Sequence, residues 1–179
     1  MSARTTDEDR TERFSRECMR WARQAAVNGG IRAEARYWEG LCLGNAVRRN
    51  AFTAVKSLPK LERTLTEAVE GAPGVDDGGP LRVMGMLYIK APAWPQGIGD
   101  VDRGLELLTE AVEQHPDHPL NHLFLAMGLW DVEEDLDGAA HELAAAMSCM
   151  RTARWVHVAP FWRREAASFA RELGVPLPD

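Results

Sequence analysis

The sequence lacks the patterns that mark β-structure, membrane spans and secretion. No run of alternating β-branched residues is bounded by hairpin turns, so a sheet protein is excluded. No apolar stretch approaches the roughly 18 residues that a membrane-spanning helix needs. The N-terminus is charged throughout and has no apolar segment, unlike a signal peptide. We therefore expect a soluble, cytoplasmic, all-α protein that does not bind membranes.

Cysteine is scarce. Cys18, Cys42 and Cys149 are odd in number and widely separated in the sequence. This spacing argues against a disulfide framework and against a CxxC site, and it predicts reduced thiols in a cytoplasmic protein.

Motifs for catalysis, cofactors and metals are also missing. The sequence has no GxSxG, HExxH or GxxxxGK[ST] pattern. The nearest approach to a metal site is formed by His115, His118 and His122, but these histidines surround a predicted turn between helices. Histidines at such turns commonly cap helix ends or face solvent. We predict no enzymatic activity, no cofactor and no metal ion.

The net charge of −6 is unevenly distributed. Residues 1–60 carry a net charge of +5, residues 61–150 carry −13 and residues 151–179 carry +2. The acidic middle repels phosphate backbones, so we expect no nucleic-acid partner. The charge polarity fits head-to-tail association of two copies or attraction of a basic partner, and solvated helix faces are the simpler alternative.

Helical periodicity covers most of the chain. In the first predicted helix, Phe14, Cys18, Trp21 and Ala25 share one face. The third helix is expected to begin with Ser57 as its N-cap and with a proline in its first turn. The predicted helices span residues 7–27, 31–49, 57–71, 80–90, 101–114 (capped by Asp100), 119–131, 136–150 and 160–173.

An internal repeat indicates how these helices are arranged. The hexapeptide Leu-Thr-Glu-Ala-Val-Glu occurs at 65–70 and again at 108–113, 43 residues later. Repeats of this length are typical of stacked helical hairpins. In the middle unit, small residues at Gly85, Gly104 and Ala111 are expected to let two helices approach closely.

The middle unit, with Leu81-x2-Met84-Gly85-x2-Tyr88 followed by Gly104-x3-Leu108, resembles a tetratricopeptide repeat. The flanking units fit the same pattern less well. The resemblance implies a right-handed helical solenoid, built as one domain over residues 1–179. Its parts are an N-terminal capping helix (7–28), three repeats (31–73, 80–116 and 119–150) and a C-terminal capping helix (160–173).

A narrower resemblance rests on the segment from Asp77-Gly78-Gly79-Pro80 to Lys90-Ala91-Pro92 and the Trp-Pro-Gly loop after it. This segment resembles the T component of TRAP transporters. T components are periplasmic lipoproteins that are thought to work beside the substrate-binding protein, so the resemblance implies a role in small-molecule uptake. The chain departs from them at Cys18, which lies in Arg-Glu-Cys-Met-Arg and matches no lipobox.

In tetratricopeptide arrays the first helix of each pair lines a concave groove. Carried over to this chain, the motif positions that point into the groove are Trp38, Asn45, Arg48, Arg82, Met86, Ile89, Met127 and Trp130. Met, Trp and Arg concentrate binding energy at interfaces. We therefore expect a non-catalytic protein-interaction module that binds a peptide or protein segment, anchored by Arg82, Met86 and Trp130. The alternatives are a transport accessory protein and a self-assembling structural subunit, a homo-oligomer.

Overall fold

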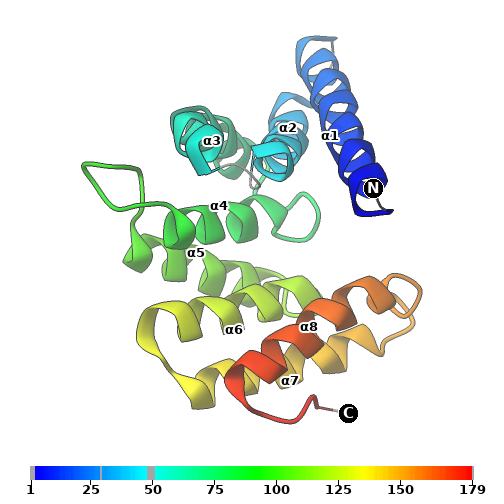
Figure 1. Cartoon of the computed structure of the whole chain (residues 1–179), viewed down its shortest axis with the longest axis vertical. Coiled ribbons are helices and arrows are strands. Elements are labelled where there is room, and N and C mark those ends of the chain that lie inside the picture. The colour runs from blue at the N-terminus through cyan, green and yellow to red at the C-terminus, as the bar shows by residue number, and fades with distance from the viewer. Residues whose placement is uncertain (1–2, 29, 48–50, 179) are drawn as a thin grey trace. The chain divides into compact units, whose positions relative to one another are not determined.

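The computed structural model describes residues 3–28, 30–47 and 51–178, and all regular elements in these ranges are helices (Figure 1). The eight helices are α1 (Ala3–Asn28), α2 (Arg32–Val47), α3 (Ala51–Gly71), α4 (Gly79–Lys90), α5 (Val101–Gln114), α6 (Pro119–Glu133), α7 (Leu136–Met150) and α8 (Ala159–Leu173).

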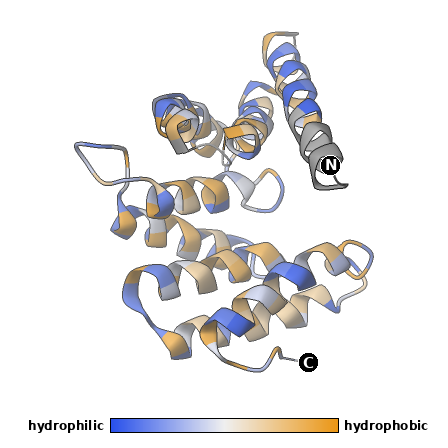
Figure 2. Ribbon diagram, in the orientation of Figure 1, coloured by the Kyte–Doolittle hydropathy of each residue, from blue (hydrophilic) through white to orange (hydrophobic). Residues whose placement is uncertain are grey.

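The predicted all-α class is confirmed, and several helix ends fall where local signals place them. Asp100 caps α5, since its carboxylate accepts a hydrogen bond from the Arg103 backbone N–H at 3.0 Å. Gly174 ends α8 in the left-handed conformation, with φ of 70°. Hydrophobic and hydrophilic residues alternate along the helices, as one-sided burial requires (Figure 2).

The start of α3 differs from the prediction. The helix begins at Ala51 and contains Pro59 in its interior. Ser57 does not act as an N-cap, because its hydroxyl donates to the Thr53 carbonyl one turn earlier, at 2.8 Å. Leu58 and Leu61 are both buried on one face of this helix, so packing outweighs the local penalty of the internal proline.

The chain divides into two compact units. Unit 1 contains α1, α2 and α3 together with Ala91–Ile98, and unit 2 contains Asp76–Lys90 and the chain from Gly99 onward. In unit 1, α2 packs against both α1 and α3. Tyr37 and Leu65 are among its most buried side chains.

Unit 2 contains two helical hairpins and a final helix. Helices α4 and α5 form one hairpin, and α6 and α7 form the other. Helix α6 also contacts both α4 and α5, while α8 contacts α7 and α6. Among the residues that the structure describes, α5 and α7 do not contact each other. The C-terminal core of this unit includes Leu123, Ala126, Leu143, Met147 and Phe169.

Close approach within the α4–α5 hairpin depends on glycine, as predicted. A Cβ on Gly85 would lie 2.8 Å from Leu108 Cγ and 2.9 Å from the Gly104 carbonyl oxygen. A Cβ on Gly104 would lie 2.6 Å from Ile89 Cγ1. No side chain fits at either contact without displacement of a neighbour.

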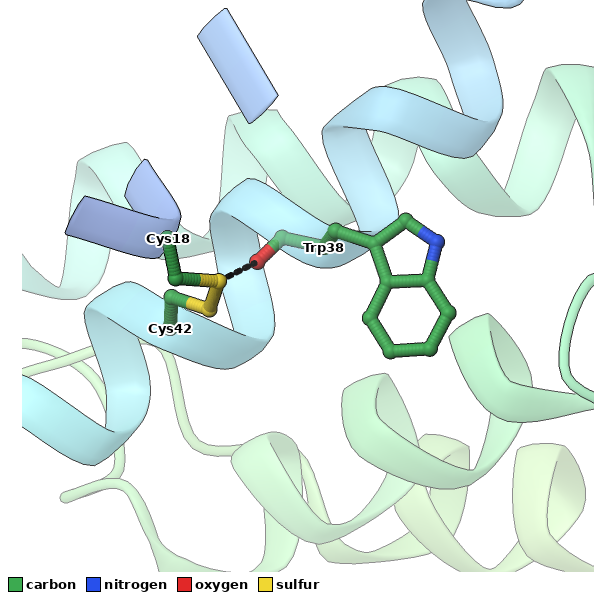
Figure 3. Close-up of a disulfide and its surroundings, with 3 residues drawn as sticks. All are labelled: Cys18, Trp38 and Cys42. Atoms are coloured by element: carbon green, nitrogen blue, oxygen red, sulfur yellow. Dashed lines mark hydrogen bonds between the residues drawn. A yellow bond between two sulfur atoms is a disulfide. The ribbon is translucent and has the colours of Figure 1, made fainter. Parts of the chain in front are cut away.

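One expectation about α1 is wrong. Cys18 and Cys42 form a disulfide that joins α1 to α2, with their Cα atoms 6.1 Å apart (Figure 3). Two helices packed side by side bring these thiols together, which distance along the sequence does not reveal. Of the residues predicted to share one face of α1, Phe14 and Trp21 are 53% and 60% exposed, and the smaller Ser15 and Ala22 are buried instead.

None of the helices in the described ranges combines the length and the hydrophobicity that a bilayer-spanning segment requires.

Candidate functional site

The predicted groove residues belong to both units, and each unit is described separately. In unit 1, Trp38 and Asn45 are exposed on α2, and Arg48 lies outside the described residues. The Trp38 carbonyl oxygen lies 3.9 Å from Cys18 Sγ, so the disulfide borders this tryptophan's backbone (Figure 3).

Unit 2 holds the remaining predicted groove residues. Met86 and Ile89 on α4, and Met127 and Trp130 on α6, are all half-buried. Since α4 contacts α6, the structure brings these two pairs to neighbouring helices. Lys90 and Asp131 form an ion pair of 2.6 Å between the C-terminal ends of the same two helices.

Arg82 lies in the interior of unit 2. Its predicted role as an anchor for a ligand in the groove requires a surface position instead. The residue is only 2% exposed. Its guanidinium donates to Asp76 Oδ2 at 2.6 Å and to Asn121 Oδ1 at 2.5 Å. A buried charge of this kind must be paired, so Arg82 here holds the loop before α4 against α6.

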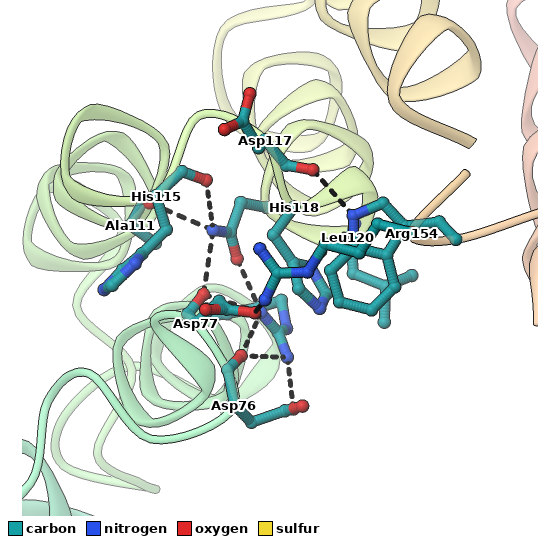
Figure 4. A network of polar contacts seen from close by, with 11 residues as sticks. Asp76, Asp77, Ala111, His115, Asp117, His118, Leu120 and Arg154 are labelled. Atoms are coloured by element: carbon teal, nitrogen blue, oxygen red, sulfur yellow. Dashed lines mark hydrogen bonds and ion pairs between the residues drawn. The ribbon is translucent and has the colours of Figure 1, made fainter. Parts of the chain in front are cut away.

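Asn121 makes four of the hydrogen bonds in this polar network, of which Figure 4 labels the partners Asp77, Ala111 and His115. The residue is fully buried, and its amide nitrogen lies 3.0 Å from three carbonyl oxygens, those of Asp77, Ala111 and His115. An amide group offers two donors and two lone pairs, and here it uses both kinds. One side chain thereby connects the Asp76–Gly78 loop, the end of α5 and the start of α6.

The loop that receives these bonds has an unusual backbone. Asp76, Asp77 and Gly78 have φ values of 52°, 47° and 82°, all in the left-handed region. Two consecutive non-glycine residues rarely adopt this conformation. The hydrogen bonds to Arg82 and Asn121, and an ion pair between Asp77 Oδ2 and Arg154 Nη2 at 2.5 Å, stabilise it.

His118 adjoins the network and stays neutral. Its Nδ1 accepts the Leu120 backbone N–H at 3.2 Å and so caps α6. Its ring packs against Trp155 and Trp162, with centroids 4.6 and 5.7 Å away. Burial, followed by the positive charge of Arg82, lowers the pKa of His118 to about 3.

His122 has the opposite electrostatic character. Its Nδ1 lies 2.6 Å from Glu142 Oε2 and its Nε2 lies 2.7 Å from the Pro116 carbonyl oxygen. Burial alone lowers the pKa of His122, but the hydrogen bonds to these two acceptors outweigh it, and the pKa is raised. In the described residues, no group of three or more His, Cys, Asp or Glu side chains is arranged to hold a metal ion.

A groove of about 610 Å³ lies along one face of α5 in unit 2. We call it the acidic groove. It is lined by Asp102, Glu106, Glu110, Glu113 and Glu133, with Leu105 and Thr109 between them. The positively charged group beside it is Arg103, which pairs with Glu106 at 2.7 Å.

The two copies of the hexapeptide therefore differ in surroundings. In the first copy, Glu67 accepts hydrogen bonds from Arg32 and Arg36, at 3.1 Å from each. In the second copy, the equivalent Glu110 lines the acidic groove and accepts a hydrogen bond from neutral Gln114 at 2.8 Å. The first glutamate of the hexapeptide is therefore paired with two arginines in unit 1, and its equivalent in unit 2 is hydrogen-bonded to a neutral amide.

Unit 1 presents a surface of opposite character on α1. Arg13, Phe14, Arg20 and Trp21 are all exposed, and we call this set the α1 outer face. The Arg20 guanidinium lies 5.1 Å from the Trp21 ring centroid, within cation–π range. From Arg13 to Val27 the helix carries four arginines and one glutamate.

The sequence interpretation missed both surfaces. The signal for the acidic groove was the spacing of residues 102, 106, 110 and 113, which places four carboxylates on one helix face. The signal for the α1 outer face was the seven-residue interval between Arg13 and Arg20, repeated between Phe14 and Trp21.

No protein-family model and no curated protein matches the chain.

Proposed function

We propose that this protein is a non-catalytic, tetratricopeptide-like interaction module whose unit 2 binds a polypeptide segment along α4 and α6. The observation that carries this proposal is the contact pattern of the hairpins. Helices α4, α6 and α8 contact one another in succession, whereas no contact joins α5 and α7 in the described part of the chain.

This pattern supports a curved array. When the first helices of successive pairs touch and the second helices do not, the first helices lie on the inner side of the curve. Inner surfaces of helical-repeat proteins are where extended ligands bind. We infer that Met86 on α4 and Met127 and Trp130 on α6, all half-buried, border that side, where Met127 and Trp130 also pack against the C-terminal core. Ile89 contributes less, because it fills the space beside Gly104 and Gly128.

The Cys18–Cys42 disulfide favours a second candidate function, that of a T-component-like accessory protein. Disulfides persist in oxidising compartments such as the periplasm. A periplasmic location agrees with the transporter family that the segment from Asp77 to Pro92 resembles, and it stands against the predicted cytoplasmic one.

The interaction proposal is tested by site-specific photo-crosslinking. A photoreactive amino acid at Met86 or Met127 is expected to crosslink one and the same polypeptide in the native host, identified by mass spectrometry. The double variant Met86→Glu with Trp130→Ala should lose that polypeptide while it keeps wild-type helicity. Arg82 is not replaced in this experiment. Because the residue is buried, its replacement would change the stability of the fold as well as any binding.

The matched control is Val156→Glu with Phe161→Ala. It makes the same types of change at side chains that are 47% and 74% exposed elsewhere in unit 2. It should retain the partner. If the Met86→Glu, Trp130→Ala variant and the control variant capture the same set of proteins as the wild type, the α4–α6 surface is not a binding site.

A further inference from the structure

We propose that the α1 outer face of one copy docks into the acidic groove of a second copy, so that the protein associates head to tail. The two surfaces differ from the α4–α6 face of the proposed function, and this inference does not depend on it. The occupant is identified by charge, by apolar content and by matching dimensions.

The charges of the two surfaces are complementary. The acidic groove has five carboxylates in its lining and one adjacent arginine. The α1 outer face carries Arg13 and Arg20, with exposed Glu17 between them, and of the two arginines at its flank Arg23 pairs with Glu39 at 2.6 Å within unit 1. Surfaces of opposite sign attract each other before contact and set the register of docking.

An exposed aromatic ring accompanies the charges of the α1 outer face. Trp21 is 60% exposed beside Arg20, and a large aromatic ring next to a guanidinium is typical of the residues that dominate interfaces. The acidic groove offers Leu105 and Thr109 between its carboxylates. An amphipathic helix laid in such a groove buries the ring and leaves the charges at the rim.

The spacing of charges is the same on both helices. Arg13 and Arg20 are separated by seven residues, as are Glu106 and Glu113. At the α-helical rise, each pair spans about 10.5 Å. Both helices continue past these positions, α1 as Ala3–Asn28 and α5 as Val101–Gln114, so the paired rows lie wholly within regular structure.

The consequence of such pairing is a heterologous interface, in which each copy uses two different surfaces. Interfaces of this kind leave one donor surface and one acceptor surface unfilled at the ends and so produce rings or open chains. The contact is formed largely by exposed charges, so it is expected to be weak, reversible and sensitive to salt.

The test is sedimentation velocity of the full chain from micromolar to millimolar concentration. At about 0.1 M ionic strength, where the Debye length is about 10 Å, the weight-average mass should rise with concentration. At about 1 M salt, where the Debye length is about 3 Å, the chain should return to monomer. Trp21→Ala should weaken association at least tenfold, and Phe161→Ala, at a still more exposed aromatic residue outside both surfaces, should not.

Charge reversal gives the decisive comparison. Arg13→Glu with Arg20→Glu, and separately Glu106→Arg with Glu113→Arg, should each abolish association. Mixing these two variants should restore it, because each then offers a surface complementary to the other. A wild type that stays monomeric at every concentration would overturn the proposal. So would association that both reversed variants retain, or a mixture of them that stays monomeric.

Discussion

At the scale of single residues, the two histidines of α6 give the protein opposing responses to pH. His118 has a lowered pKa and is neutral in the folded state, whereas His122 has a raised pKa and is stabilised when protonated. The contribution of neutral His118 to the free energy of unfolding is fully present above the ordinary histidine pKa. It is lost as the pH falls toward about 3. Stability from His122 is present at low pH and is lost as the pH rises through its raised pKa.

We predict that His118→Asn flattens the acid side of the stability curve. Asparagine retains the N-cap of α6 but has no proton to take up. Between pH 6 and 4 the wild type should lose stability relative to this variant, at up to about 1.4 kcal/mol per pH unit. Urea unfolding at each pH measures the difference. His141→Asn, an exposed histidine on α7, should follow the wild type. If the stability of His118→Asn falls with acid pH as steeply as that of the wild type, protonation of His118 is not what destabilises the fold.

Asn121 gives a second prediction at this scale. Asn121→Ala removes the acceptor for buried Arg82 and the donor for three carbonyl groups, of which that of Ala111 is buried and those of Asp77 and His115 are partly buried. We expect a loss of about 3 kcal/mol, because the buried guanidinium of Arg82 keeps its ion pair with Asp76 but loses the Asn121 acceptor, and the carbonyl groups lose their donor. The matched change Asn45→Ala, at an exposed residue, should alter stability by less than about 0.5 kcal/mol. Equal costs for the two variants would show that the buried network contributes no stability.

Residues of the buried network and of the disulfide were difficult to predict for a common reason. Local patterns place a residue on a helix face, so Asp100 as a cap and Gly85 as a contact were predicted correctly. The pairing of Arg82 with Asn121 joins residues 39 apart in the sequence, and no local pattern encodes it. The Cys18–Cys42 disulfide likewise depends on which helices pack together.

At the scale of helices, the glycines of the α4–α5 hairpin determine how closely its backbones approach. Gly85→Ala should destabilise unit 2 by about 1–3 kcal/mol, since the new methyl group overlaps Leu108 and the Gly104 carbonyl. Gly44→Ala is the control. Its Cβ would lie 4.0 Å from Leu61 Cδ2, so the alanine should stabilise α2 by about 0.5–1 kcal/mol. Opposite signs in thermal unfolding confirm the argument, and a stabilising Gly85→Ala refutes it.

The attachment of α1 to α2 gives another prediction at this scale. Replacing both Cys18 and Cys42 with serine removes the cross-link between the helices. The unfolded chain gains freedom, and unit 1 should lose about 3 kcal/mol of stability. Reduction of the wild type should have the same effect. The control is Cys149→Ser, which leaves the disulfide intact. Identical melting of oxidised and reduced protein would show that the bond adds nothing.

At the scale of the whole molecule, the division into two compact units predicts unfolding in two steps. Scanning calorimetry should resolve two transitions. The double serine variant should lower only the transition of unit 1, and Gly85→Ala should lower only that of unit 2. A single transition that both variants shift by the same amount would show that the units unfold together.

Of the three cysteines, Cys149 is the one outside the disulfide. Its free thiol can serve as a native probe of local structure. Its thiol donates to the Pro116 carbonyl oxygen at 3.6 Å, and burial, with the charge of Asp117, raises its pKa. Alkylation in the closed state is therefore slow, since the thiolate is the reactive form. The labelling rate is therefore sensitive to the contact between this thiol near the end of α7 and the turn before α6, without any engineered probe.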